Sequence, residues 1–298
     1  MSPPVVVVHG GAGGVTDELR EHEADVRAAI ERSLAAAAEA LTDAGAGAVE
    51  AVRAAVMVLE AFPLFNAGYG SALCSDGTVE LSASVMRGSD RAAGGVAMMT
   101  RTAHPVAAAT ALLDEPEVLL VGDAAEVHAA TRGLEQLDPD SFVTERQRRR
   151  LAARLATRAG AKTAVEPETV GAVCLDGAGL LAAATSTGGL SGQRRGRVGD
   201  SPLIGAGTWA DRHVAVSCTG QGEAFIRAGA ARLVAALIEH GHTLESAAHK
   251  ALAAVAECGG SGGLIAVDIH GNFVTPLSTG AMPRGVWRAG EKPVTTVP

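Results

Sequence analysis

Residues 169–187 read TVGAVCLDGAGLLAAATST, and this stretch decides the fold. Thr169–Leu175 and Leu180–Thr185 are short, mainly apolar runs, and the turn-forming residues 176–179 (DGAG) separate them. We therefore predict two buried strands joined by a turn. The preceding residues 159–168 show no hydrophobic period, and we interpret them as an exposed linker.

Helices and strands alternate in blocks on both sides of this stretch. Towards the N-terminus we expect strands at 5–8 and 78–86 and helices at 17–43, 48–61, 105–113, 123–132 and 143–158. Towards the C-terminus we expect strands at 203–209, 213–218, 263–269 and 272–276 and helices at 221–240 and 244–257. This order predicts an α+β fold in which one sheet packs on another, with helices outside.

The net charge argues against two classes of binding partner. The 298 residues include 33 acidic and 25 basic side chains, which gives a net charge of -8. We expect neither nucleic acid nor a membrane surface as partner, because both attract positively charged proteins. The basic run Arg146–Arg150 is interpreted as a solvated helix face, with Leu151 and Leu155 on its buried side.

The cysteines and histidines argue against a metal cofactor. The four cysteines lie far apart without a CxxC pair, and the histidines lack HxxxH spacing, so we expect no catalytic metal, disulfide framework or other catalytic cofactor. The valines at 5–8 are too few for a signal sequence, and no run of 18 apolar residues occurs. We expect a cytoplasmic protein.

The glycine-rich segment 9–14 (HGGAGG) follows the first predicted strand. A dinucleotide-binding loop that starts with Gly11 and Gly13 would need a third glycine at position 16, which is Thr16. No GxxxxGK[ST] phosphate loop occurs either. We interpret the segment as a compact turn near a functional site.

Thr169 opens its strand directly after the linker, which suggests one particular chemistry. A hydrolase can use the hydroxyl of an N-terminal threonine as nucleophile and the α-amine of the same residue as base. Thr169 would become N-terminal only after a cut behind Glu168. The alternative is that Thr169 is merely a β-forming residue, as most threonines that open a strand are.

Several longer motifs occur in fixed order from about residue 5 to residue 285. They are VHGGAG at 8–13, FNAGYGS at 65–71, DGTVELSASVM at 76–86, TVGAV at 169–173, ATSTGG at 184–189, GRVGDSP at 196–202, GAG at 205–207 and TGQGE at 219–223. Together they resemble the plant-type asparaginase and isoaspartyl peptidase family of N-terminal nucleophile hydrolases. The resemblance implies an αββα four-layer sandwich that forms a single domain over 1–298.

The resemblance implies a role for each matching residue. Thr169 would be the nucleophile, and Thr187 would bind the amine of Thr169. The hydroxyl of Thr219 and the N–H of Gly220 would form an oxyanion hole.

With Thr219 and Gly220, four further residues would form the substrate-binding site. Arg197 would bind its α-carboxylate and Asp200 its α-ammonium. Gly222 would keep the loop thin enough for the substrate, and Asn66 would lie near the nucleophile or simply cap a turn. The implied activity is hydrolysis of the β-amide of isoaspartyl dipeptides and of L-asparagine.

The resemblance also implies processing and assembly. Cleavage between Glu168 and Thr169 would yield an alpha subunit, 1–168, and a beta subunit, 169–298, and the processed halves would pair into a dimer of heterodimers. A structural sodium ion would be held by the backbone carbonyls of Leu59, Glu60, Phe62, Phe65, Ala67 and Tyr69.

Two other functions stay open at this point. One is a glycosylasparaginase-like hydrolase. The other is an unprocessed, non-catalytic relative that binds aspartate-like ligands, because Glu168 stands where the family usually has glycine before the nucleophile.

Overall fold

The strands of this computed structural model, which describes residues 2–42, 47–157 and 169–298, form two sheets. The larger sheet contains β1 (Val5–His9), β2 (Leu81–Arg87), β3 (Ala93–Met99), β4 (Leu119–Val121), β5 (Val170–Leu175), β6 (Leu181–Thr187), β11 (Arg284–Arg288) and β12 (Val294–Thr296). Its order is β12-β11-β1-β5-β6-β2-β3-β4. The smaller sheet contains β7 (Thr208–Ala210), β8 (Val214–Gly220), β9 (Gly262–Asp268) and β10 (Phe273–Val274), in the order β10-β9-β8-β7.

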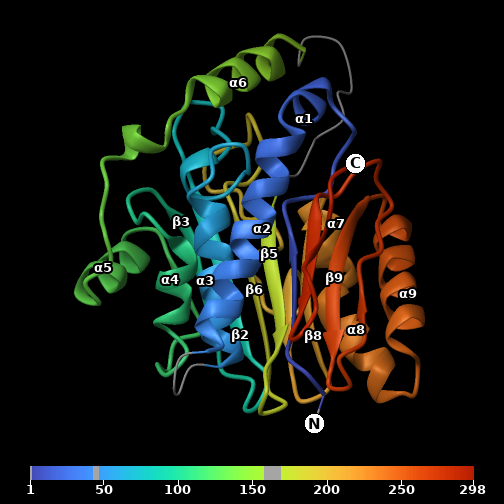
Figure 1. Ribbon diagram of the computed structural model, residues 1–298. Coiled ribbons are helices and arrows are strands. Elements are labelled where there is room, and N and C mark those ends of the chain that lie inside the picture. Colours follow the sequence, from blue (N-terminus) through green and yellow to red (C-terminus); the bar gives the residue numbers. More distant parts are fainter. Residues whose placement is uncertain (1, 43–46, 158–168) are drawn as a thin grey trace.

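Helices flank these sheets. Those before the linker are α1 (Asp17–Glu21), α2 (Glu23–Ala40), α3 (Ala48–Glu60), α4 (Pro105–Thr110), α5 (Asp123–Thr131) and α6 (Glu145–Thr157). Those after it are α7 (Gly222–Ala228), α8 (Ala230–Glu239) and α9 (Leu244–Glu257). Figure 1 shows α2, α3 and α4 on one side of the strands and α8 and α9 on the other.

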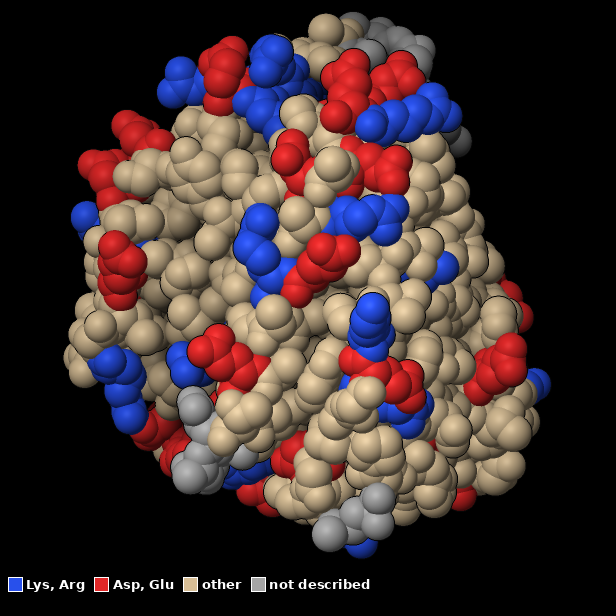
Figure 2. Space-filling view, viewed as in Figure 1, with Lys and Arg blue, Asp and Glu red and all other residues tan. Residues whose placement is uncertain are grey.

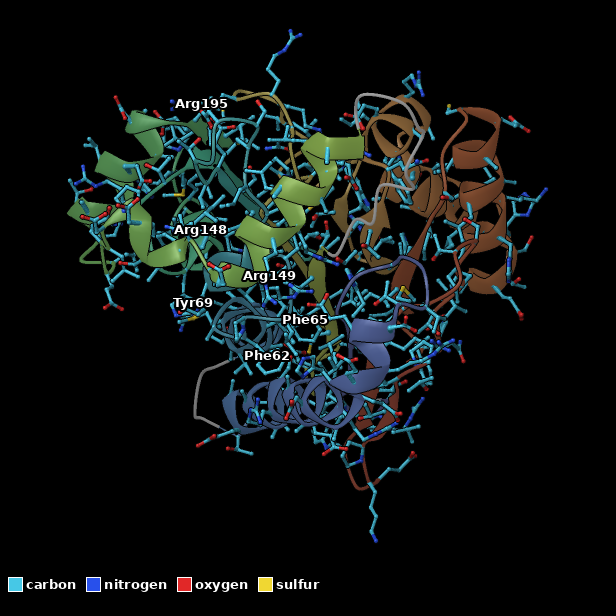
Figure 3. All side chains as sticks on the ribbon, turned by 90° about the horizontal axis from the view of Figure 1, so that it is seen from above. Phe62, Phe65, Tyr69, Arg148, Arg149 and Arg195 are labelled. Carbon is cyan, nitrogen blue, oxygen red and sulfur yellow. The ribbon has the colours of Figure 1, made fainter. Side chains whose placement is uncertain are left out.

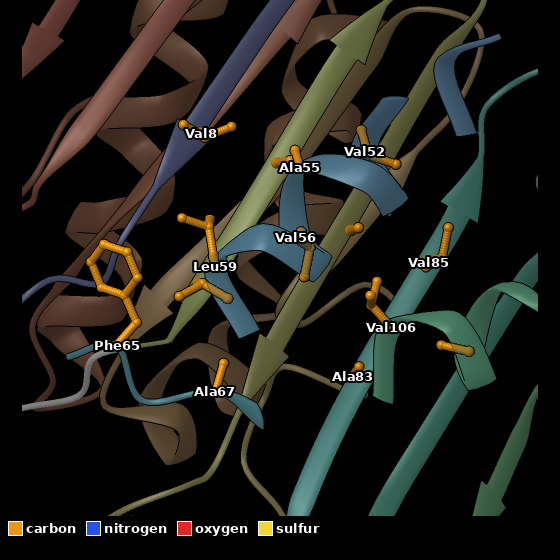
Figure 4. Close-up of a cluster of buried hydrophobic side chains, with 14 of the residues drawn as sticks. Val8, Val52, Ala55, Val56, Leu59, Phe65, Ala67, Ala83, Val85 and Val106 are labelled. Atoms are coloured by element: carbon orange, nitrogen blue, oxygen red, sulfur yellow. The ribbon is translucent and has the colours of Figure 1, made fainter. Parts of the chain in front are cut away.

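The alternation of side chains along each strand explains this layering. In β1, Val6 and Val8 pack under α2 and α3, whereas Val5 and Val7 face the smaller sheet. Figure 4 shows the helix-side core, in which Val8 of β1 and Leu59 of α3 belong to the same cluster as Val85 of β2 and Val106 of α4. The α+β class is confirmed, and both faces of the larger sheet are buried.

The predicted pair of strands at 169–187 is confirmed. β5 and β6 pair antiparallel, with Val170 opposite Ser186 and Leu175 opposite Leu181. The carboxylate of Asp176 holds the turn, because its Oδ1 accepts the N–H groups of Ala178 at 2.9 Å and Leu180 at 2.8 Å.

Several boundaries differ from the predictions. The expected helices 17–43 and 221–240 are each two helices, broken at His22 and at Gly229, which has a φ of 57°. The strand expected at 203–209 is mostly wrong. Residues 200–207 form turns, and only residues 208 and 209 belong to β7. The strands β3, β4, β11 and β12 were not predicted.

The basic run on α6 is less exposed than predicted. The Nε of Arg146 donates to Glu18 Oε1 at 2.6 Å, so this arginine joins α6 to α1. Leu151 is buried as expected, but Leu155 is 42% exposed. The prediction for Leu155 is wrong because α6 lies at the edge of the molecule (Figure 1), where only Gln147 and Leu151 of residues 145–156 are buried.

The surface in Figure 2 carries acidic and basic side chains side by side, without a broad area of one sign. Across the described residues, no helix combines the length and the apolar character needed to span a lipid bilayer.

The close approach of α4 to β3 generates a prediction about stability. A Cβ on Gly94 would overlap the carbonyl oxygen of Ala109 and lie 2.7 Å from Leu112 Cβ. We expect Gly94→Ala to lower the free energy of unfolding by about 1–3 kcal/mol, because a clash with a backbone carbonyl is relieved only if α4 and β3 move apart. Urea unfolding would measure the loss. The control is Gly177→Ala, whose Cβ would meet only Pro4 Cγ at 3.7 Å, and an equal loss in both variants would contradict the explanation.

Candidate active site

Thr169 and Thr187 face each other where β5 begins and β6 ends. The Oγ1 of Thr169 donates to the Oγ1 of Thr187 at 3.0 Å, as expected if the register of β5 and β6 continues by one residue. Thr187 Oγ1 also accepts the N–H of Gly189 at 3.0 Å. Thr169 is only 5% exposed. Its hydroxyl is oriented by Thr187, whose own Oγ1 is held by the N–H of Gly189.

Asn66 fastens the loop that follows Thr187. Its Nδ2 donates to the Gly189 carbonyl at 2.6 Å, and its own carbonyl accepts the N–H of Gly188 at 3.0 Å. Its Oδ1 accepts the N–H of Ala72 at 2.7 Å, which fixes the amide orientation. Asn66 therefore contacts the loop that directly follows Thr187, and it holds Gly188 and Gly189 in place.

Thr219 and Gly220 end strand β8 on the facing sheet. The Oγ1 of Thr219, fully buried, accepts the N–H of Ala12 at 3.1 Å, which leaves its own hydrogen for another acceptor. A Cβ on Gly220 would lie 2.6 Å from the Ser261 carbonyl, so only glycine fits the turn into α7. The glycine-rich segment 9–14 thus reaches the site, as predicted.

Arg197, Asp200 and Gly222 meet at one place. A Cβ on Gly222 would lie 2.9 Å from Asp200 Oδ1 and 3.0 Å from Arg197 Nη2. Any side chain at position 222 would therefore fill the space beside the guanidinium and the carboxylate. The three residues predicted to bind the amino-acid end of a substrate lie together.

Arg197 is paired with Glu223, a partner that was not predicted. Its Nε and Nη2 donate to the two carboxylate oxygens of Glu223 at 2.9 and 3.0 Å. These hydrogen bonds lower the pKa of Glu223. The Nη1 of Arg197 also lies 3.4 Å from Gln193 Oε1, which accepts the N–H of Leu190 at 2.9 Å. The signal for Glu223 was its place in the TGQGE motif, in the first turn of a helix.

The carboxylate of Asp200 forms no ion pair with any of the described residues. Asp200 is 3% exposed, and its Oδ2 has no hydrogen-bond partner among the described residues. Burial raises the pKa of Asp200 to about 7, although the guanidinium of Arg197 opposes the shift. A ligand that brings an ammonium group would supply the missing donor.

His9 is a further residue of the site to which the sequence assigned no role. It is fully buried, and its Nε2 lies 3.1 Å from Ser217 Oγ, while its Nδ1 accepts the N–H of Gly11 at 3.3 Å. Burial lowers the pKa of His9 to about 3, and a hydrogen bond with the backbone of Thr169 opposes this shift. His9 is therefore neutral at physiological pH and lies beside the predicted nucleophile.

The loop predicted to bind sodium follows α3 and contacts the strand that ends at Thr187. The carboxylate of Glu60, at the end of α3, accepts the hydroxyl of Ser186 at 2.6 Å. Figure 3 shows Phe62, Phe65 and Tyr69 in this loop, which contacts α6. The described residues contain no group of three or more histidine, cysteine, aspartate or glutamate side chains arranged for a metal ion. The predicted cleavage residue Glu168 lies outside the described residues.

Comparisons with known proteins agree with this geometry. A family model described as asparaginase matches residues 2–297. The chain is 42% identical to the isoaspartyl peptidase of Salmonella typhimurium, over 100% of this chain and 99% of that protein. It is also 42% identical to the isoaspartyl peptidase of Escherichia coli, over 100% and 97% of the two chains. The human isoaspartyl peptidase/L-asparaginase is 40% identical, over 97% and 93%.

The raised pKa of Asp200 predicts a pH dependence of ligand binding. Above about pH 7 the carboxylate is charged and can bind an α-ammonium, and below this pH it is protonated. We expect the inhibition constant of L-aspartate to increase about tenfold between pH 8 and pH 6. Succinate lacks the ammonium group and serves as the control, because its binding does not need the charge on Asp200. The explanation is wrong if the two ligands show the same pH profile.

Proposed function

The chain belongs to the asparaginase family, and we propose that it is a self-processing amidohydrolase. It cleaves the β-amide of isoaspartyl dipeptides and of L-asparagine. The observation that carries the proposal is the pair of hydroxyls of Thr169 and Thr187, 3.0 Å apart where β5 and β6 meet. A nucleophile of this class needs a buried threonine whose hydroxyl is oriented and whose amine can be freed.

Maturation begins at Thr169 itself. Its Oγ attacks the carbonyl carbon of Glu168, the peptide bond breaks, and the nitrogen of Thr169 keeps its hydrogen and gains a proton. The acyl group moves from nitrogen to oxygen, and water then hydrolyses the ester. The products are the chains 1–168 and 169–298, and Thr169 now carries a free α-amine.

Turnover uses the same oxygen. The freed α-amine, whose pKa in model peptides is about 7.7 to 8, accepts the proton of the Thr169 hydroxyl. The Oγ attacks the β-carbonyl carbon, and the leaving amine departs with that proton. Water then attacks the resulting β-aspartyl ester, which releases aspartate and restores the hydroxyl. Thr187 holds the nucleophile during both steps.

The oxyanion formed at each attack is stabilised by Thr219 and Gly220. Thr219 Oγ1 accepts the N–H of Ala12, so the hydrogen of the Thr219 hydroxyl is left to donate to the oxyanion. This supports the assignment. The backbone N–H of Gly220 is the second donor. Such donors are fixed before the reaction begins, and losing one typically costs about 100- to 1000-fold in rate.

Arg197 and Asp200 bind the amino-acid end of the substrate. The guanidinium offers a planar pair of donors to the α-carboxylate, and the carboxylate of Asp200 accepts the α-ammonium. Their shared position over Gly222 supports this assignment. Both groups of the substrate occur in asparagine and in isoaspartyl dipeptides, so one binding site serves both.

The proposal extends to architecture and assembly. The layers correspond to an αββα four-layer sandwich of the N-terminal nucleophile hydrolase type, made of an alpha subunit, 1–168, and a beta subunit, 169–298. Two processed heterodimers form a dimer, and the exposed apolar side chains Leu119 and Val121 of the edge strand β4 support a contact with another chain. The free thiols support a reducing, cytoplasmic location.

A sodium ion in the loop after α3 belongs to the same proposal. The carbonyls of Phe62 and Ala67 each accept one backbone N–H within the loop, which leaves each a second lone pair, and the carbonyl of Leu59 completes this side of the donor set. With the carbonyls of Glu60, Phe65 and Tyr69 they form an oxygen-only donor set, which suits a hard cation. The ion would stabilise the loop that positions Asn66, and it takes no part in the reaction.

Maturation is tested by Thr169→Ala. Without the hydroxyl there is no nucleophile, so a denaturing gel should show one full-length band. Thr169→Ser is the matched control, because it keeps the hydroxyl and loses only the methyl group that restricts χ1. We expect Thr169→Ser to be cleaved more slowly than the parent chain. Two bands from Thr169→Ala would refute the autocatalytic mechanism.

Substrate binding is tested by Arg197→Ala, after cleavage before Thr169 has been confirmed. Removing the guanidinium leaves a desolvated carboxylate unpaired, which costs on the order of 2 to 5 kcal/mol. We expect kcat/KM to fall by roughly 30- to several-thousand-fold for both asparagine and β-Asp-Leu. The dipeptide α-Asp-Leu is the negative control. A variant that lost activity on β-Asp-Leu but kept it on asparagine would show that the two substrates do not share this site.

A further inference from the structure

A line of buried polar side chains runs between the two sheets, in a space that is otherwise apolar. It consists of His9 on β1, Ser217 on β8, Thr185 on β6, Thr208 on β7 and Ser84 on β2, and we call it the hydroxyl chain. All five residues are 0% exposed. Side chains such as Val7, Ala183 and Ile265 fill the rest of this interface. Buried polar groups are costly unless each finds a partner, so five in a row require an explanation.

Each member of the hydroxyl chain contacts the next at hydrogen-bond distance. His9 Nε2 lies 3.1 Å from Ser217 Oγ, which lies 2.7 Å from Thr185 Oγ1. Thr185 Oγ1 lies 2.6 Å from Thr208 Oγ1, which lies 2.7 Å from Ser84 Oγ. These contacts cross from one sheet to the other four times.

The hydroxyl chain ends on a backbone carbonyl. Ser84 Oγ lies 2.6 Å from the carbonyl oxygen of Ser201, which can only accept. The hydrogen of Ser84 Oγ is shared between this carbonyl and Thr208 Oγ1, and Thr208 Oγ1 donates towards Thr185 Oγ1. In the contact between Thr185 and Ser217, either hydroxyl can donate.

His9 supplies a hydrogen at the other end of the hydroxyl chain. Its Nδ1 accepts the N–H of Gly11 at 3.3 Å, so the hydrogen of the neutral ring lies on Nε2. The Gly207 carbonyl is a longer alternative acceptor for Thr185, at 3.3 Å, and it already accepts the N–H of Cys218 at 2.8 Å. A buried network in which every member has a partner holds its side chains in one arrangement.

The two ends of the hydroxyl chain lie at the two halves of the site. At one end, His9 contacts the backbone of Thr169, and a Cβ on Gly171 would overlap Ser217 Oγ and lie 2.6 Å from His9 Nε2. At the other end, the Ser201 carbonyl directly follows Asp200 in the chain. The chain of hydrogen bonds therefore joins the strand of the nucleophile to the loop that carries the ammonium-binding carboxylate.

We infer that the hydroxyl chain is a positioning network that couples the placement of Thr169 to that of Asp200. The inference rests on the roles of these two residues in the proposed function. Members of the hydroxyl chain touch no reacting atom. They hold the nucleophile and the ammonium site at one separation, so that the β-carbonyl of a bound substrate reaches Thr169 Oγ. A shift of either half would disturb both binding and attack.

The test is Thr185→Val, which keeps the shape of the side chain and removes the central hydroxyl. With β-Asp-Leu, we expect kcat to fall and KM to rise, each by about tenfold, because both halves of the site lose their common support. Thr185→Ser restores a hydroxyl and should recover most of both losses. Ser33→Ala is the matched control, since Ser33 is also 0% exposed and donates to the Ala55 carbonyl at 2.9 Å, away from the site. It should lower the melting temperature without changing the kinetic constants.

A double variant tests the coupling directly. Ser84→Ala lies at the far end of the hydroxyl chain and contacts neither Thr169 nor His9, yet it should lower kcat. Adding it to Thr185→Val should have less effect than adding it to the parent chain, because the network is already broken. If Thr185→Val does not fold, Ser84→Ala and Thr208→Val replace it in the same cycle.

Two outcomes would overturn the inference. One is kinetic constants within about twofold of the parent for folded Thr185→Val and Ser84→Ala. The other is strictly additive effects of the two substitutions. Either result leaves the proposed function intact if the parent chain cleaves β-Asp-Leu and Thr169→Ala does not. An inactive but fully processed parent chain would instead refute the proposed function.

Discussion

The antiparallel register of β5 and β6 is the constraint on which the site depends. Because successive side chains point to opposite faces, a shift of one residue would turn Thr169 towards the helices and away from the facing sheet. The turn at Asp176 sets this register, since its Oδ1 holds two N–H groups of the turn and its Oδ2 accepts the N–H of Ala48 at the start of α3. One carboxylate thus links the position of the nucleophile to the helix that covers the sheet.

Glycines shape the site as much as the polar side chains around them. Gly171 leaves room for His9 and Ser217, and Gly222 leaves room for Arg197 and Asp200. In both cases a polar group occupies the space that a Cβ would fill, so the glycine is needed for close approach. At these two positions, glycine is what allows polar side chains from the two sheets to meet at short distance.

The sequence predicted those elements whose own residues determine their structure. α3 and α9 follow the helical period, and β5 and β6 are apolar runs separated by strong turn residues. β3 was missed because its sequence, AGGVAMM, has little intrinsic strand preference and is stabilised by pairing with β2. The strand expected at 203–209 contains Gly205 with a φ of 90°, a conformation typical of turns, and most of this segment folds as one.

The site residues came from motifs, whereas the partners that tune them are distant in sequence. Arg197 lies only three residues from Asp200 in the chain, yet its ionic partner is Glu223 on the first turn of α7. Since Asp200 is buried and Glu223 is 57% exposed at its side chain, the guanidinium is held from the solvent side and its inner edge faces Asp200. A substrate carboxylate must then share Arg197 with Glu223 or displace Glu223 from it. This exchange adds little net affinity. It favours ligands whose ammonium group also pairs with Asp200, so Asp200 and Glu223 act mainly on selectivity.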